Sequence, residues 1–165
     1  MRILVLSDSH SALSFMCYCI DLIKPNAVVH LGDYYDDAMA IEEAYPNIPF
    51  YCVPGNCDRH RNVLNAPETR VERVCGVKLF MTHGHLHGVK LGVGSLLRGA
   101  EKTDAQAVLY GHTHSAHCER TENGLWILNP GSCGYYGGSA GLITVSDGKI
   151  SGCRILRQSA MESAF

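Results

Sequence analysis

The sequence predicts one mixed α/β domain whose second half is rich in β-strands. Short apolar runs bounded by Gly, Pro, Asn or Asp recur along the chain, as is typical of strands. Segments with helical spacing separate the first three runs, which favours parallel pairing with helices packed outside. Because the chain has 165 residues, 46% of them hydrophobic, we expect a single domain over residues 1–165.

Each expected element rests on its own local pattern. Strands are predicted over Ile3–Leu6, Ala27–Leu31, Phe50–Val53, Thr69–Val74, Val77–Met81, Ala107–Tyr110, Leu125–Leu128, Leu142–Val145 and Ile150–Leu156. Helices are predicted over Leu13–Ile23, over Asp36–Ala44, and within Val89–Lys102, where each interior glycine weakens the pattern by about 1 kcal/mol. The pairs Cys75-Gly76 and Asp147-Gly148 predict tight hairpins.

Composition and charge exclude several classes of protein. The net charge of −2 gives no basic field that would attract nucleic acid or an anionic membrane. The eight cysteines form no CxxC pair, which argues against a disulfide framework or structural zinc and favours small buried thiols. The apolar run Ile3–Leu6 is too short for a signal peptide, and no run could span a bilayer. We therefore expect a cytoplasmic protein.

Potential metal ligands follow five of the predicted strands. The segments are Asp8-Ser9-His10, Gly32-Asp33, Gly55-Asn56-Cys57-Asp58, His83-Gly84-His85 and Gly111-His112-Thr113-His114. In an open α/β sheet, residues beyond the carboxyl ends of strands converge on one crevice. Glycines before the ligands would let the chain turn sharply there. By contrast, His30 lies inside a predicted strand and is expected to be an ordinary buried histidine, whereas His87 and His117 are expected at the surface.

These motifs, in this order, resemble those of the calcineurin-like metallophosphoesterase superfamily, and the chain is most similar to its small YfcE-like branch. The resemblance implies a four-layer αββα sandwich, in which two mixed β-sheets are flanked by helices, with two divalent metals at one edge. It places Asp8, His10 and His114 on one metal. It places Asn56, His83 and His112 on the other, with Asp33 bridging both. Oxygen and imidazole donors without thiolate suit Mn foremost, and also Fe, Ni or Zn.

The expected activity is hydrolysis of a small phosphate ester, foremost a phosphodiester, through a metal-bridging hydroxide that attacks phosphorus. Asn56 is expected to orient the ester. Many relatives have His after this Asn, but the chain has Cys57, a thiol expected to ionise more readily beside the metals and a poor copy of an imidazolium acid. His85 is the best remaining acid, and Asp58 is expected to orient a histidine.

Two alternatives remain open at this point. A non-catalytic interaction scaffold can use the same fold, as the retromer scaffold subunit does, although there key metal-site residues are lost. A pyrophosphatase or nucleotide hydrolase would use the same metals on another bond. The segment Arg59-His60-Arg61 is expected to be a solvated loop that could reach a phosphate, and Asn129-Pro130-Gly131-Ser132 a turn near the pocket. The role of Tyr135-Tyr136 and assembly into a homo-oligomer are left open.

Overall fold

Two five-stranded mixed sheets form the centre of the molecule, which we describe from a computed structural model covering residues 1–58, 63 and 65–163. The first sheet has the strand order β10-β9-β1-β2-β3. Its strands are β1 (Arg2–Leu6), β2 (Ala27–His30), β3 (Phe50–Cys52), β9 (Ser139–Ser146) and β10 (Lys149–Arg157). The strands β1, β2 and β3 are parallel, whereas β9 and β10 pair antiparallel to their neighbours.

The second sheet has the order β4-β5-β6-β8-β7. Its strands are β4 (Thr69–Val74), β5 (Val77–Thr82), β6 (Ala107–Leu109), β7 (His117–Arg120) and β8 (Trp126–Asn129). The three inner strands β5, β6 and β8 are parallel, and the two edge strands are antiparallel to them. Each sheet thus contains three parallel strands whose carboxyl ends face one side.

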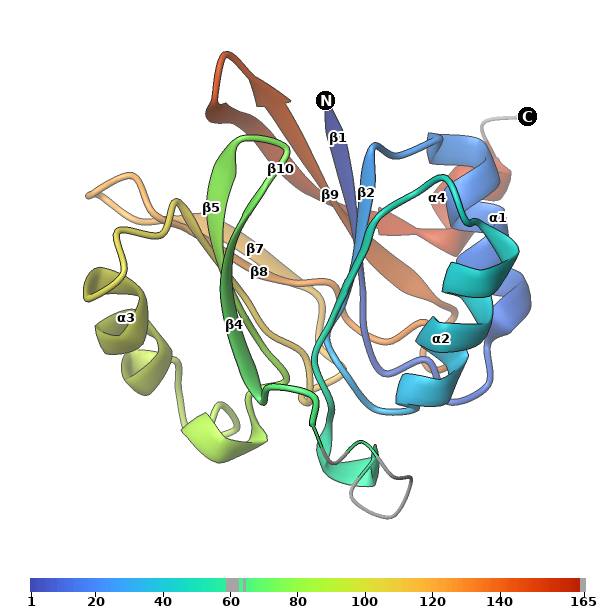
Figure 1. The fold of residues 1–165 in the computed structure, drawn as a ribbon, viewed down its shortest axis with the longest axis horizontal. Helices are drawn as coiled ribbons and strands as arrows, with labels where there is room; N and C mark the ends of the chain where they lie inside the picture. The colour runs from blue at the N-terminus through green and yellow to red at the C-terminus, as the bar shows by residue number, and fades with distance from the viewer. Residues whose placement is uncertain (59–62, 64, 164–165) are drawn as a thin grey trace.

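Helices cover the outer faces of both sheets. They are α1 (Leu13–Ile23), α2 (Tyr35–Ala44), α3 (Gly94–Glu101) and α4 (Gln158–Glu162), with short 3₁₀ turns at Asn56–Asp58 and His85–His87. Figure 1 shows α1, α2 and α4 beside the first sheet and α3 beside the second, so the layers run helix, sheet, sheet, helix. The predicted αββα sandwich is confirmed. Within the part of the chain that the structure describes, no helix is both long and apolar enough to cross a bilayer.

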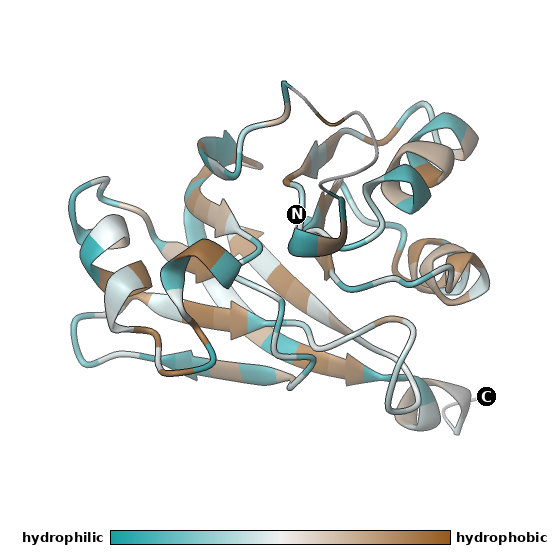
Figure 2. Ribbon diagram, turned by 90° about the horizontal axis from the view of Figure 1, so that it is seen from below, coloured by the Kyte–Doolittle hydropathy of each residue, from teal (hydrophilic) through white to brown (hydrophobic). Residues whose placement is uncertain are grey.

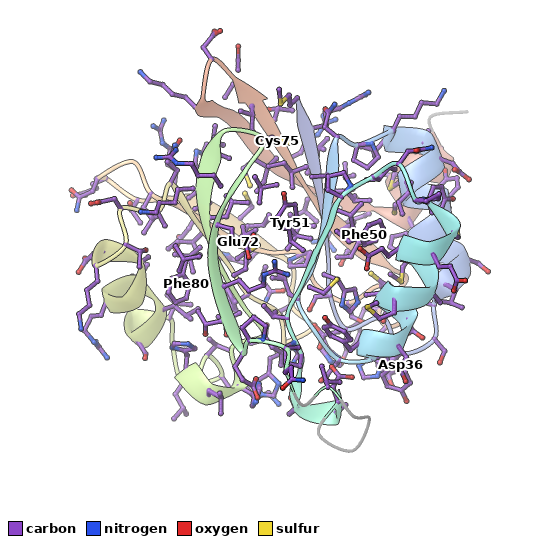
Figure 3. The ribbon with its side chains drawn as sticks, in the orientation of Figure 1. Asp36, Phe50, Tyr51, Glu72, Cys75 and Phe80 are labelled. Atoms are coloured by element: carbon purple, nitrogen blue, oxygen red, sulfur yellow. The ribbon has the colours of Figure 1, made fainter. Side chains whose placement is uncertain are left out.

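The core follows from the two-residue periodicity of the strands. On β1, Ile3 packs into a cluster between the two sheets, whereas Leu4 packs into a cluster under α1 and α2. Likewise Tyr51 lies between the sheets and Phe50 faces the helices, while Phe80 of β5 packs under α3 (Figure 3). Hydrophobic residues accordingly concentrate on the strands (Figure 2).

Most predicted elements match the structure. The helix over Leu13–Ile23 has the predicted bounds, and both predicted hairpins turn through two residues with positive φ, as a type I′ turn requires. The strand β7 and the helix α4 were not predicted. The sequence of β7, His-Cys-Glu-Arg, lacks a clear apolar pattern because this edge strand is mostly exposed. Gly99 is tolerated inside α3 because a Cβ there would lie only 3.0 Å from the Phe80 ring.

Candidate metal centre

The predicted ligands lie in loops that follow the parallel strands of both sheets. Asp8 and His10 follow β1, and Asp33 follows β2. The chain starts at the top of Figure 1 with β1, so the carboxyl ends of β1 and of its parallel neighbour β2 face the lower edge of the picture. The second sheet contributes residues after β5 and β6, so two separate sheets supply one centre.

Five predicted ligands have a left-handed backbone, which is uncommon outside glycine. Their φ angles are 51° for Asp8, 43° for His10, 58° for Asp33, 68° for His112 and 57° for His114. Each such residue costs on the order of 1 kcal/mol. Strain concentrated on these residues indicates a functional constraint rather than ordinary loop geometry.

Lack of space for a Cβ explains Gly55 and Gly111, two of the three glycines before the ligands. Gly32 has a φ of 93° and turns the chain as predicted, but Gly55 and Gly111 do not have positive φ. A Cβ on Gly55 would collide with the backbone and carboxylate of Asp33, and one on Gly111 would collide with the Ser7 hydroxyl. These two positions therefore require glycine for space, not for a sharp turn as the sequence suggested.

The first ligand group comprises Asp8, His10, Asp33 and His114. One ligand atom from each of these residues lies within 4.8 Å of all the others. Nε2 of His10 is buried and makes no hydrogen bond within the described part of the chain, whereas Oδ1 of Asp8 lies 3.0 Å from Nε2 of His114. Buried polar atoms without such partners are costly, and a bound cation is one way to satisfy them. The group therefore fits a divalent metal.

The second ligand group comprises Asn56, His83 and His112, together with the shared Asp33. Nε2 of His83 lies 3.1 Å from Oδ1 of Asn56 and 3.5 Å from Oδ1 of Asp33. Nδ1 of His83 donates to the carbonyl of Leu31 at 2.7 Å, so its Nε2 carries a lone pair toward the other donors. The ring of His112 lies 5.1 Å from that of His83, centroid to centroid. The structure thus brings all seven predicted ligands into two adjoining groups.

The surroundings shift the pKa values of Asp8, His114 and His112 in different directions. Burial opposes the charged form of Asp8, but the neighbouring His114, the nearby His83 and the Ser7 hydroxyl together hold the pKa of Asp8 below its ordinary value. Contact with Asp8 raises the pKa of His114. Burial, followed by repulsion from His83 and Lys90, lowers the pKa of His112 to about 4. His112 is therefore neutral at pH 7, as a metal ligand must be.

Within the described residues, Asp58 contacts backbone groups and is not seen to orient a histidine. Its two carboxylate oxygens accept hydrogen bonds from the backbone N–H groups of Tyr35, at 2.8 Å, and Gly55, at 2.7 Å. No histidine in the described ranges hydrogen-bonds to it. Asp58 instead joins the Gly55 loop to the first turn of α2, where an acidic side chain is favoured.

Cys57 lies beside the Asp33 carboxylate, and its ionisation beside bound metals stays a prediction. Its side chain is exposed, and partial burial of the sulfur, followed by the Asp33 carboxylate, raises the pKa of the thiol to about 11. The surrounding side chains therefore oppose ionisation rather than favouring it. The backbone N–H of Cys57 donates to Oδ1 of Asp33 at 2.9 Å, so this residue contacts the shared ligand through its main chain.

His85 lies beside the second ligand group. Its ring centroid is 5.4 Å from that of His83 and 6.1 Å from that of His112. Nε2 of His85 is 3.8 Å from a carboxylate oxygen of Glu68, which is too long for a hydrogen bond but gives an imidazolium an anionic neighbour. The geometry is compatible with the predicted acid.

Three residues that sequence reasoning did not assign to the centre hold its loops in place. The Ser132 hydroxyl donates to the Asp8 carbonyl at 2.7 Å. The Asn129 amide donates to the Gly111 carbonyl at 3.1 Å, which fixes the segment that carries His112. Asp37 of α2 accepts from the Ser11 N–H at 2.7 Å. The sequence indicated Asn129 and Ser132 only as parts of the predicted Asn-Pro-Gly-Ser turn, and it gave no indication of the Asp37 contact.

Comparison with known proteins agrees with this arrangement. A family model described as the calcineurin-like phosphoesterase superfamily domain matches residues 1–148. The chain belongs to this superfamily. It is 29% identical over 140 residues to a probable metallophosphoesterase, YsnB, of Bacillus subtilis, covering 80% of this chain and 75% of that protein. It is also 29% identical over 154 residues to the phosphodiesterase MJ0936 of Methanocaldococcus jannaschii, covering 84% and 88%.

Solved structures share the fold of this superfamily member. A predicted phosphoesterase of Streptococcus pneumoniae has a TM-score of 0.72 at 23% identity, with 94% of this chain and 97% of that chain covered. Vps29 of Entamoeba histolytica complexed with Zn²⁺ has a TM-score of 0.71 at 20% identity, with 96% of this chain and 99% of that chain covered.

The segment Arg59-His60-Arg61, which was expected to be a solvated loop, lies outside the described residues.

Proposed function

We propose that this chain hydrolyses phosphodiesters with two divalent ions held by the two ligand groups. Family membership and the cluster of Asp and His side chains support a metal-dependent phosphoesterase. The observation that carries the proposal is the convergence of Asp8, His10, Asp33 and His114 within 4.8 Å, where the buried Nε2 of His10 has no hydrogen bond among the described residues. We further propose that the protein is cytoplasmic, as its eight free cysteines support.

The donor set defines the metal that fits. Asp8 and Asp33 are the only carboxylates among the seven proposed ligands, and the imidazoles bind metal in their neutral form. Oxygen and imidazole donors of this kind favour a transition ion, and we propose Mn foremost, with Fe, Ni or Zn as alternatives. When bound, two such ions lower the pKa of shared water and clamp the oxygens of a phosphoryl group.

The chain's own residues would position the ester and move the proton. Within the second ligand group, Oδ1 of Asn56 contacts His83 and its Nδ2 contacts the exposed Cys57, so the amide nitrogen lies on the Cys57 side of the group. His85 is the proposed acid because its Nε2 faces the Glu68 carboxylate and its ring adjoins the second group. A thiol is a weak acid and a thiolate has no proton to give, so Cys57 cannot replace an imidazolium and esters with good leaving groups should react best.

The test combines metal analysis with a panel of esters. The purified protein is expected to contain close to two transition ions per chain and to hydrolyse bis(4-nitrophenyl) phosphate faster than 4-nitrophenyl phosphate when Mn²⁺ is added. Chelation should abolish both rates. A protein that binds the metals but hydrolyses nothing on the panel would contradict the proposal and favour the interaction scaffold. Preferential cleavage of pyrophosphate would favour the third candidate.

A substitution at Cys57 tests the preference for diesters. Cys57→His would place an imidazole beside the second ligand group, which should raise monoester hydrolysis relative to diester hydrolysis by about tenfold. Cys57→Ser, which keeps the size but supplies no acid of suitable pKa, is the matched control and should leave the ratio unchanged. If Cys57→His changes neither rate nor ratio, Cys57 has no part in the selectivity.

A further inference from the structure

An anchored aromatic residue stands beside the first ligand group. Tyr135 follows the Asn129–Ser132 turn, and its backbone N–H donates to the Ser132 hydroxyl at 3.0 Å. That hydroxyl donates in turn to the Asp8 carbonyl. The Tyr135 carbonyl accepts from the Gly138 N–H at 3.1 Å. The backbone of Tyr135 is therefore fixed relative to a proposed metal ligand and is not part of an untethered loop.

The Tyr135 ring contacts two proposed ligands. It stacks on the His114 ring with a centroid distance of 5.2 Å and an interplanar angle of 13°, and it meets the His10 ring edge-on at 4.8 Å. His114 thus covers one side of the ring, yet 48% of Tyr135 remains exposed. Tyr136 follows at 6.4 Å, centroid to centroid, and is 88% exposed.

Some exposed apolar side chains lie in two loops next to predicted site residues, whereas Met1, Leu13 and Met39 are exposed elsewhere. Of the large hydrophobic residues that the structure describes as exposed, Leu86 and Leu91 lie in the segment after His85, and Tyr135 and Tyr136 lie beyond the Asn129–Ser132 turn. Exposed apolar surface that adjoins a polar site marks a place where a ligand binds. A substrate held at the metals would carry its organic group past one of these two segments.

We propose that Tyr135 and Tyr136 form an aromatic platform that selects phosphoesters bearing a flat aromatic group. The inference rests on the proposed phosphoesterase activity and adds the class of substrate. A flat ring on the ester can stack on the exposed part of Tyr135 while the phosphate occupies the centre, because the Tyr135 ring already lies against the two imidazoles. Aromatic pairs of this kind favour an aryl over an alkyl group by about three- to tenfold.

Two phosphonates measure this selection without turnover. Phenylphosphonate and methylphosphonate share the same charged head, and their C–P bond is not an ester bond. Titration calorimetry on the Mn²⁺-loaded protein is expected to show phenylphosphonate binding about three- to tenfold more tightly. In Tyr135→Ala this ratio should fall to near one, whereas Tyr135→Phe, which keeps the ring, should retain it. Tyr135→Leu, which keeps apolar volume without a flat face, should retain less than half of the selectivity.

The ratio separates selection from mere support of His114. If Tyr135 only holds His114 in place, its loss weakens both phosphonates equally, the ratio stays at its wild-type value, and the inference is wrong. Met39→Ala removes an exposed apolar side chain on α2, away from the aromatic platform, and should leave the ratio unchanged. A change as large as that in Tyr135→Ala would overturn the assignment to the platform.

Hydrolysis supplies the second readout. Phenyl 4-nitrophenyl phosphate and methyl 4-nitrophenyl phosphate release the same leaving group, so their kcat/KM ratio reports the remaining ester group. The wild-type protein should prefer the phenyl ester by about the ratio found for the phosphonates. Equal kcat/KM values together with equal affinity for the two phosphonates would overturn the aromatic platform and leave the proposed function standing. Failure to bind either phosphonate and to cleave either ester would overturn the proposed function, and the platform with it.

Discussion

The two ligand groups differ in how completely the protein prepares them. The first has two carboxylates, Asp8 and Asp33, and its four donor atoms already lie within 4.8 Å of one another. The second has only the shared Asp33, and Asn56 sits in a short 3₁₀ turn where its amide contacts the Cys57 sulfur at 3.4 Å. The greater negative charge of the first group favours cation binding there. We therefore expect the two ions to bind in sequence, the first group filling first.

Removing the shared carboxylate should have the largest effect. Asp33→Asn is expected to reduce metal content from two ions to fewer than one and to lower hydrolysis by on the order of 1,000-fold or more, because both groups lose their common anion. The fold should survive, since the amide oxygen can still accept from the Cys57 N–H. Metal analysis, steady-state rates and thermal unfolding measure these effects. Asp36→Asn, at an exposed helix position, is the control, and two ions retained in Asp33→Asn would rule out a shared ligand.

Breaking one group at a time should separate the two binding steps. His10→Ala is expected to remove the tight step of an Mn²⁺ titration, whereas His83→Ala should remove the weak step and leave the tight one. Each variant should lose hydrolysis by about 100-fold or more, because the proposed reaction needs both ions. Calorimetric titration of the metal-free protein provides the measurement. Loss of the same step in both variants would show that the groups are not distinct.

Adding a methyl group beside Asp33 should have a smaller effect than losing a ligand, and the effect should be on stability. Gly55→Ala would push a methyl group into the Asp33 backbone and carboxylate, and should lower the free energy of unfolding by about 1–3 kcal/mol. Gly94→Ala, where the added Cβ would meet only an arginine side chain at 3.6 Å, should be neutral or slightly stabilising. Urea unfolding of both variants tests the difference. Equal stability of the two would mean that the loops around Asp33 adjust freely.

A buried histidine behind the first group should make stability depend on pH. The Gly32 N–H donates to Nδ1 of His30 at 3.3 Å and Nε2 contacts the Ser9 hydroxyl at 3.3 Å, so the ring is neutral, and burial lowers its pKa from 6.5 to about 4. Above pH 6.5 the ring is neutral in the folded and the unfolded chain. Below it only the unfolded chain takes up the proton, until the pH approaches 4, so the free energy of unfolding falls as the pH drops through this window.

The His30 contribution should be about 2 kcal/mol between pH 7 and pH 5. Urea unfolding at both pH values measures it, with His30→Gln as the variant that lacks the titrating ring. His117→Gln, at an exposed position, is the matched control and should keep the wild-type pH dependence. A His30→Gln protein with the same pH dependence as the wild type would show that other groups cause it.

Much of the fold was predictable from the sequence because strands and helices with one buried face carry a clear period. The edge strand β7 could not be found this way, since His117 and Arg120 are exposed and leave no alternation to read. The proposed ligands could be predicted from the sequence because each lies in a segment that follows a predicted strand. The role of Asp58 could not be predicted, because its two partners are backbone N–H groups, which have no signature in the sequence. Similarly, Tyr135 stacks on His114 because two loops that are distant in sequence come together, and no local sequence pattern predicts that contact.

The contact between Ser132 and Asp8 also bears on how the protein is made. His114 follows Asp8 by 106 positions in the sequence, and the hydroxyl that secures the Asp8 carbonyl comes from a residue 124 positions after it. The four donors of the first group therefore come together only after the segment through His114 has been synthesised. On the proposed function, we therefore expect tight metal loading only after β6 of the second sheet has joined the strands β1 and β2 that precede the other three donors.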